Sequence, residues 1–166
     1  MSQTPNTREV SPHQLAYRQL LVGITNQIQG RALDTQLDEW LNECHGVQSD
    51  TYQEIKRLTF TGVKEGWLCN REAGGLKYGR IFKPADDLNG FSVDVVDMEN
   101  IAGPHHLHPL GEIDLIMPIE SEALFDDRKA GWMVNPPGSE HAPTVSNGRA
   151  FVLYLLPQGQ IQFTQP

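Results

Sequence analysis

Cysteine is scarce in this chain. Cys44 and Cys69 are the only two among 166 residues, and they lack CxxC spacing. Small domains that depend on disulfides carry a much higher density of cysteine. The sequence therefore excludes a disulfide scaffold, and we interpret both residues as reduced thiols with packing roles.

Long apolar runs are also missing. A typical apolar stretch, from Phe151 to Leu156, is far shorter than the roughly 20 residues that span a bilayer. The N-terminal sequence MSQTPNTREV contains no apolar signal segment. We therefore expect a soluble, cytoplasmic protein with no membrane partner.

Positively charged residues are fewer than negatively charged ones: 13 Lys and Arg against 21 Asp and Glu give a net charge of -8. Such a field repels phosphate backbones, so we expect no nucleic-acid partner. The chain has no GxGxxG or P-loop and no Gly-x-Ser-x-Gly. Nucleotide chemistry and serine hydrolysis therefore have no support.

The length of 166 residues and 39% hydrophobic content fit one domain with a small appendage. Residues 1–10 are polar and aperiodic, which predicts a disordered tail. Residues 11–66 are predicted to form a helical N-terminal portion of three helices, beginning at Ser11, at Asp34 or Thr35, and at Ser49. The oligomeric state stays open, a homo-oligomer included.

From residue 67 to 166 the pattern changes to short runs rich in Val, Ile, Phe and Tyr, separated by turn residues. Many short strands of this kind predict a β-sandwich or barrel, so the expected fold is mainly β with a helical N-terminal portion. The expected strands are 77–82, 91–98, 105–108, 112–118, 123–125, 131–134, 141–145, 150–155 and 161–164.

The segment GPHHLHPLGE, residues 103–112, holds three of the six histidines and a carboxylate. Side chains at i and i+2 of a strand share a face, so His106 and His108 point one way and His105 the other. Residues 109–111 allow a turn that returns Glu112 to the same interior. These three side chains are predicted to reach one ion.

A second segment, GWMVNPPGSEH at residues 131–141, ends in another histidine after a Pro-Gly turn. We predict His141 as the fourth ligand. Imidazoles and a carboxylate suit one divalent transition metal ion, and the ligand set leaves Fe(II), Mn(II), Zn(II), Ni(II) and Cu(II) open.

These two segments resemble the cupin motifs, which are His-x-His, three further residues and then Glu, and Pro-x-Gly-x-x-His. Asn100, Ile119 and Val145 depart from the usual motif residues, and the gap between Gly131 and Pro136 is one residue short, but no ligand is lost. The resemblance implies a cupin-type jelly-roll β-barrel, residues 67–166, with the metal inside.

The run from about residue 75 to 163, with GPHHLHPLGEIDLIMPIE, GWMVNPPGSEHAPTV and FVLYLLPQGQIQF, is similar to the 4-hydroxylaminobenzoate lyase family of bacterial nitroarene degradation. Its members also carry a helical N-terminal portion. The resemblance implies conversion of 4-hydroxylaminobenzoate to 3,4-dihydroxybenzoate (protocatechuate) with release of ammonia.

Further residues are candidates for chemistry. His105, Glu140 and Tyr154 are candidate catalytic proton carriers, although His105 also fits an outward-facing role and Tyr154 a core role. Arg80 is a candidate for binding a substrate carboxylate, because a guanidinium offers two parallel donors. Trp132 is either an aromatic wall for the substrate or part of the core. Asp114 is a further candidate acid or base. It shares strand parity with Glu112, so it is alternatively a candidate for holding a ligand imidazole.

Two other functions remain open at this point: an iron(II) cupin dioxygenase acting on a hydroxylated or aminated benzoate, and a non-catalytic ligand-binding cupin. Oxygen uptake separates the first from a lyase, and tight binding without product identifies the second.

Overall fold

The structure, a computed structural model, describes residues 10–164. Apart from Val10, the tail predicted over residues 1–10 lies outside that range. None of the helices in the described part is both long and apolar enough to cross a bilayer. Both cysteines are free thiols; Cys69 is buried, whereas Cys44 is exposed and does not have the packing role that we predicted.

The three predicted helices are present, and each begins at the predicted capping residue. The side chains of Ser11, Asp34 and Ser49 accept hydrogen bonds from backbone N–H groups of the first turn. The third helix ends at Gly66, whose φ of 87° suits glycine. The bounds are α1 Pro12–Ile28, α2 Thr35–His45 and α3 Asp50–Glu65.

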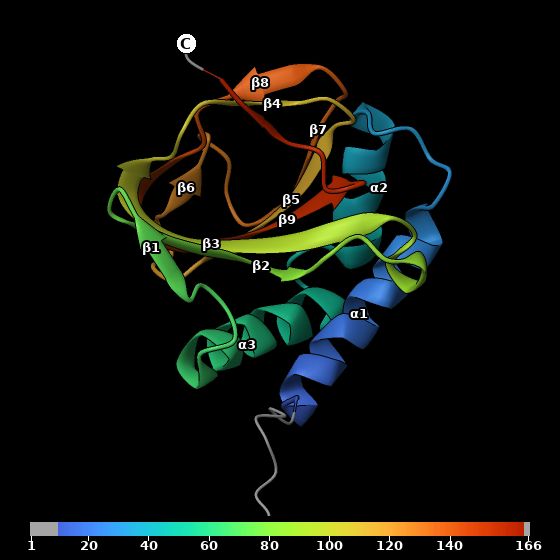
Figure 1. The fold of residues 1–166 in the computed structure, drawn as a ribbon, viewed down its shortest axis with the longest axis horizontal. Coiled ribbons are helices and arrows are strands. Elements are labelled where there is room, and N and C mark those ends of the chain that lie inside the picture. Colours follow the sequence, from blue (N-terminus) through green and yellow to red (C-terminus); the bar gives the residue numbers. More distant parts are fainter. Residues whose placement is uncertain (1–9, 165–166) are drawn as a thin grey trace, which may run out of the picture.

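The rest of the chain is β-structure with one short 3-10 helix, η1 Asp86–Leu88. Figure 1 shows the strands in two layers, with the helices outside them. Their bounds are β1 Arg71–Ala73, β2 Leu76–Phe82, β3 Phe91–Ala102, β4 His106–His108, β5 Glu112–Pro118, β6 Leu124–Phe125, β7 Gly131–Asn135, β8 Ser139–His141, β9 Thr144–Pro157 and β10 Gln162–Phe163.

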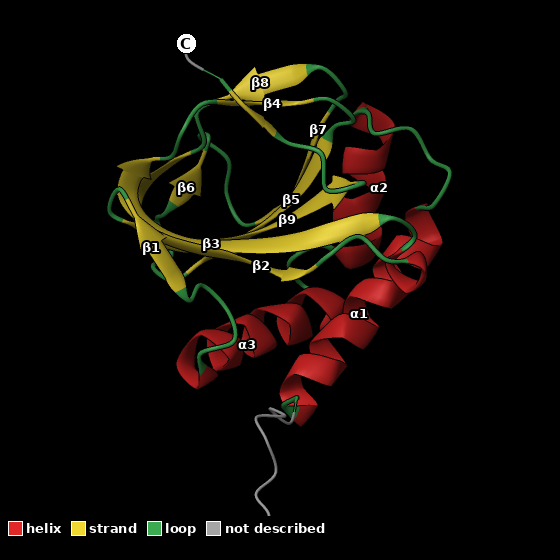
Figure 2. Ribbon diagram, viewed as in Figure 1, coloured by secondary structure: helices red, strands yellow, loops and turns green. Residues whose placement is uncertain are grey.

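The large sheet has the order β1-β2-β3-β9-β5-β7, with β6 paired to β9, and the small sheet has the order β10-β4-β8. All these pairs are antiparallel. The predicted class is confirmed as a jelly-roll-like, mainly β fold with three N-terminal helices (Figure 2). The strands form two facing sheets, however, and no closed barrel.

The large sheet is buried on both faces. Its outer face packs against the helices, where Leu115, Leu153 and Trp132 share one core with Tyr17 and Leu41. Its inner face, toward the small sheet, holds a second cluster that includes Ile116, Val152 and Phe125. Successive residues of one strand alternate between these two cores.

Two strand predictions were wrong. The strand expected over residues 141–145 is divided, because His141 ends β8 and Thr144 begins β9, with Ala142 and Pro143 between them. Proline lacks the N–H that a sheet ladder requires. β1, residues 71–73, was not expected because its side chains are polar and exposed.

Candidate metal centre

The four predicted ligands lie together between the two sheets. β4 presents His106 and His108 on one face, and β8 places His141 directly opposite His106 in the antiparallel register. A turn after β4 returns the chain so that Glu112 begins β5. Gly111 makes this turn with a φ of 93°, and a Cβ there would lie 2.9 Å from the carbonyl oxygen of Asn135.

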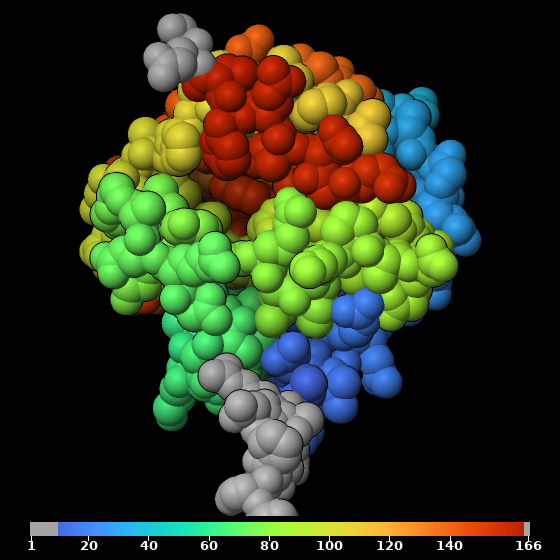
Figure 3. All heavy atoms as spheres, viewed as in Figure 1, coloured from blue at the N-terminus to red at the C-terminus, as the bar shows by residue number. Residues whose placement is uncertain are grey.

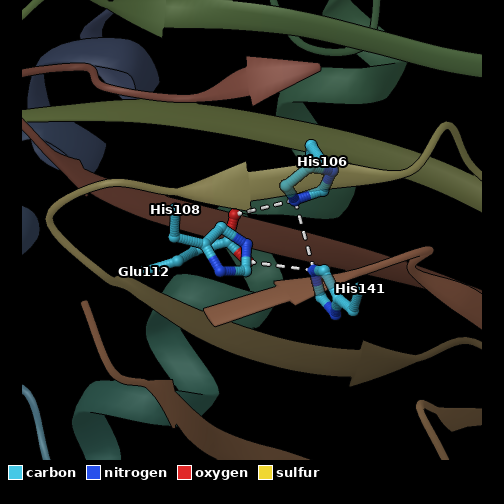
Figure 4. Close-up of side chains that lie close together, drawn as sticks. All are labelled: His106, His108, Glu112 and His141. Carbon is cyan, nitrogen blue, oxygen red and sulfur yellow. Dashed lines mark hydrogen bonds and ion pairs between the residues drawn. The ribbon is translucent and has the colours of Figure 1, made fainter. Parts of the chain in front are cut away.

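One ligand atom from each of these four residues lies within 4.8 Å of every other. His108 Nε2 is 3.2 Å and His141 Nε2 3.6 Å from Glu112 Oε1, while His106 Nε2 is 3.6 Å from Glu112 Oε2. His141 Nε2 and His106 Nε2 are 3.2 Å apart. Figure 4 shows the three rings and the carboxylate converging on one point.

The other ring nitrogen of each histidine has its own partner. His106 Nδ1 lies 3.1 Å from the carbonyl oxygen of Pro104, and His108 Nδ1 lies 3.0 Å from the hydroxyl of Ser139. His141 Nδ1 is 2.5 Å from a carboxylate oxygen of Asp126. Acceptors at Nδ1 direct the Nε2 lone pairs toward the centre, as in metal sites.

The centre contains polar atoms that nothing in the described chain satisfies. His108 Nε2 and both oxygens of Glu112 are buried and have no hydrogen-bond partner. Buried polar groups without a partner are unfavourable by roughly 1–3 kcal/mol each. A divalent cation bound by these atoms would remove that penalty, so the residues fit a metal ion.

The ionisation of the cluster follows from its geometry. Burial raises the pKa of Glu112, but its interactions with His106, His108 and His141 outweigh burial and lower it well below the ordinary value. Burial lowers the pKa of His141, whereas Asp126 and Glu112 raise it, to about 9 overall. The carboxylate is therefore ionised and available to a cation, and a cation must displace a proton from His141.

A row of polar side chains crosses the inner face of the large sheet beside the cluster. The register pairs Arg80 with Asp94, Asp94 with Tyr154, and Tyr154 with Asp114 on four neighbouring strands. The Asp114 carboxylate accepts a hydrogen bond from Asn135, and its other oxygen is buried without a partner. The inner face is thus polar at the level of the cluster.

Two groups of this row, Asp114 and Tyr154, have shifted pKa values. Burial, and next the charge of Glu112, raises the pKa of Asp114 well above the ordinary value. Burial, and next Glu112, also raises the pKa of Tyr154, so its phenol stays neutral. Arg80 donates to both oxygens of Asp94, at 2.8 and 3.2 Å, and to the carbonyl oxygen of Gly159 at 3.3 Å.

The remaining candidates lie away from the cluster. His105 Nε2 lies 3.3 Å from a carboxylate oxygen of Glu140, and each of these residues directly precedes one of the clustered histidines, so both project from the opposite side of the small sheet. Trp132 pairs with Leu115 on the helix-packed face, is 1% exposed and donates its indole N–H to the carbonyl oxygen of His45. The structure therefore does not bring these three residues to the cluster.

Three groups next to the cluster were not among the predicted site residues: Asp126, Ser139 and the carbonyl of Pro104. Ser139 and Pro104 are close in sequence to ligands, so the motifs contained a local signal for them. Asp126 is 15 residues from His141 and has no recognisable motif. It adjoins His141 only because β6 pairs with the start of β9.

Comparison with solved structures finds proteins of the cupin type. An RmlC-like cupin protein from Ralstonia eutropha aligns with a TM-score of 0.42 and 12% identity, over 56% of this chain and 62% of the other. A protein with a double-stranded β-helix domain from Klebsiella pneumoniae aligns with a TM-score of 0.44 and 19% identity, over 61% and 94% of the two chains.

Sequence comparison is more specific. The chain is 31% identical over 161 residues to a 4-hydroxylaminobenzoate lyase from Pseudomonas putida, covering 87% of this chain and 92% of that one. It is 32% identical over 147 residues to a 4-hydroxylaminobenzoate lyase from a Nocardioides species, covering 83% and 87%. The family profile of 4-hydroxylaminobenzoate lyase matches residues 19–163, a range that includes all four clustered ligands. The chain therefore belongs to the 4-hydroxylaminobenzoate lyase family, a family of lyases.

Proposed function

We propose that this protein converts 4-hydroxylaminobenzoate to 3,4-dihydroxybenzoate and ammonia, and that it needs one divalent transition metal ion held by His106, His108, Glu112 and His141. Family membership supports the reaction. The observation that supports the metal is the buried cluster whose Nε2 and carboxylate atoms converge while every Nδ1 has another partner.

The reaction balances without an oxidant. The hydroxylamine and one water contain the atoms of the catechol and ammonia, and the N–O bond supplies the oxidation level of the product. The proposed sequence is loss of the N–OH oxygen as water, addition of water to the ring carbon next to the C–N carbon, and hydrolysis of the resulting imine to release ammonia. A metal ion, when bound, supplies Lewis acidity that polarises the departing hydroxyl or lowers the pKa of a water.

Tyr154 is the catalytic candidate that faces the inner side of the fold. Its side chain is 6% exposed and lies on the same face of the large sheet as Glu112. Because the pKa of Tyr154 is raised, its hydroxyl keeps its proton at neutral pH and can donate a hydrogen bond to the departing N–OH oxygen. We place Tyr154 in that role.

The apolar side chains between the sheets suit an aromatic ring. Figure 3 shows a hollow in the surface, bordered by residues near β2 in green, by the end of β3 in yellow and by the C-terminal segment in red. Phe163 packs edge-on against the ring of His106, with centroids 5.8 Å apart, yet is 63% exposed. An exposed aromatic side chain beside a ligand histidine provides a contact for the ring of the substrate.

Arg80 is the proposed partner of the substrate carboxylate. It lies at one end of the polar row that contains Tyr154 and Asp114. Asp94 engages its Nε and Nη2, and within residues 10–164 no acceptor is hydrogen-bonded to Nη1, which is left for the substrate. The Arg80 side chain is 34% exposed, so its guanidinium is accessible, and its planar donors suit a carboxylate.

The test combines metal analysis with an anaerobic assay. We expect about one equivalent of divalent metal per chain, and equal amounts of ammonia and 3,4-dihydroxybenzoate from 4-hydroxylaminobenzoate under argon. The double variant His106→Ala, His108→Ala should lose both metal and turnover while keeping its circular dichroism spectrum. A stoichiometric requirement for O₂ would instead identify a dioxygenase. Ligand binding without product would identify a non-catalytic protein.

A further inference from the structure

His141 is the most weakly supported member of the cluster. Its side chain is 15% exposed, whereas those of His106, His108 and Glu112 are at most 2% exposed. It belongs to β8, a strand of three residues at the edge of the small sheet that pairs with β4 alone. Burial and strand pairing therefore orient this ring less strictly than the other two.

A tight turn next to His141 supplies the orientation that burial and strand pairing do not. Phe125 and Arg128 exchange both backbone hydrogen bonds, at 2.9 Å each, around the two-residue turn Asp126-Asp127. Both aspartates have positive φ, 49° and 66°, as in a type I′ turn. The turn follows β6, whose pairing with β9 places it beside the residues that follow His141.

The turn places a carboxylate on the imidazole. One oxygen of Asp126 lies 2.5 Å from His141 Nδ1, and the other accepts a hydrogen bond from the backbone N–H of Thr144 at 2.9 Å. The neighbouring Phe125, fully buried, packs against the edge of the His141 ring at a centroid distance of 6.2 Å. The contact with Asp126 and the packing of Phe125 together fix the plane of the His141 ring and its rotation within that plane, and both come from this turn.

We propose that Asp126 is a positioning residue for the metal centre, which holds the proton of His141 on Nδ1 and turns Nε2 toward the ion. The proposal rests on the metal centre proposed above. Ligand imidazoles commonly donate to a carboxylate in this way, and removal of such a partner weakens metal affinity by about 10–100-fold. The Nδ1 atoms of His106 and His108 have neutral partners, a carbonyl and a hydroxyl, so Asp126 is the one charged Nδ1 partner among the three.

Asp127 is a matched control. It is adjacent, has the same charge and backbone conformation, and is exposed. Asn tolerates positive φ, so Asp126→Asn and Asp127→Asn should both keep the turn while each removes one charge. Asp126→Ala removes the acceptor altogether.

The experiment measures the affinity of each metal-free protein for Zn²⁺ in competition with a chromophoric chelator. We expect Asp126→Asn to bind Zn²⁺ about 10–100-fold more weakly than wild type, Asp126→Ala more weakly still, and Asp127→Asn within about twofold. In the zinc-loaded proteins, ¹⁵N NMR should show the hydrogen-bonded His141 Nδ1–H in wild type and Asp127→Asn, and a shifted resonance in Asp126→Ala.

Two results would overturn the proposal: affinity of Asp126→Asn within twofold of wild type, or an equal loss in Asp127→Asn, which would mean that the turn and not the contact matters. Failure of the metal centre is a separate outcome. It would appear as zinc binding by the His106→Ala, His108→Ala variant equal to that of wild type.

Discussion

The two faces of the large sheet share the same strands but contain different chemistry. In β5, Ile113, Leu115 and Met117 face the helices in a core without ionisable groups from that strand. The alternate residues, Glu112 and Asp114, face the small sheet and are fully buried. One strand of seven residues thus contributes both to the stabilising core and, through Glu112 and Asp114, to the polar site.

The division of the large sheet into an apolar helix-packed face and a polar inner face explains why the site can contain several buried polar groups. Burial of apolar surface contributes roughly 25 cal/mol per Å², and the helix-packed face provides most of that surface. The inner face contains Glu112, whose unpaired oxygens destabilise the fold when no ion is bound, and Asp114, which has a further unpaired buried oxygen. The helical N-terminal portion therefore helps to stabilise the site, although none of the four clustered residues comes from it.

Trp132→Ala tests the stabilising face. The indole is buried and donates a hydrogen bond to His45, so we expect the free energy of unfolding to fall by about 3–5 kcal/mol. Denaturant titration measures the loss. Protein that remains folded should still bind one equivalent of metal, and loss of metal at unchanged stability would contradict the division between the faces.

Two tyrosine substitutions, one on each face of the large sheet, test the difference between the faces. Tyr154→Phe should lower kcat by about 100-fold, because the inner-face hydrogen-bond donor is lost, and should leave the free energy of unfolding within about 1 kcal/mol. Tyr52 on the helix side donates its hydroxyl to the carbonyl oxygen of Ile116 at 2.9 Å. Tyr52→Phe should therefore lower stability by about 1 kcal/mol and leave kcat unchanged. If Tyr52→Phe lowered kcat and Tyr154→Phe lowered only stability, the role proposed for Tyr154 would be refuted.

Arg80→Met tests specificity at the end of the polar row. We expect the preference for a carboxylated over an uncarboxylated ring, measured as kcat/KM, to fall by about 2 kcal/mol, or roughly 30-fold. Asp94→Asn is the control, because it leaves the guanidinium in place and removes its competing carboxylate. That variant should retain or increase the preference, and equal losses on both substrates in Arg80→Met would assign Arg80 a structural role.

The smallest expected effect is on stability, and it comes from an exposed carboxyl group of the helices, Glu65, at a distance from the sheet. Hydrogen bonds from Trp67, His13 and Ser11 lower the pKa of Glu65 from 4.5 to about 2. A carboxyl whose pKa is lower in the folded protein stabilises it above the unfolded pKa, and this contribution disappears as the pH falls from about 4.5 to about 2.

Urea titrations of wild type and Glu65→Gln measure that contribution. The variant should be slightly less stable at about pH 7, and the difference should disappear near pH 2. Because these side chains are exposed and distant from the inner face, kcat should not change. A difference that is constant over this pH range would exclude the ionised Glu65 as its source.

Local pattern predicted much of this fold. The capping residues of all three helices were recognisable because each cap involves residues within one helical turn. The strand at residues 112–118 was predicted with its exact bounds. The strand predicted over residues 141–145 failed because two strands meet there from different sheets, and pairing partners are not a local property.

The sequence by itself identified three of the four clustered residues, because the period of two in a strand and a short turn link them within seven residues, 106–112. It identified His141 as the residue after the Pro-Gly turn of the second segment. Strand parity also grouped Glu112 with Asp114. Only the tertiary structure decided that the other face of β5 packs against the helices and that Trp132, which pairs with Leu115, lies on that helix-packed face. The contact between Asp126 and His141 likewise depends on strand pairing between distant segments, which no local spacing encodes.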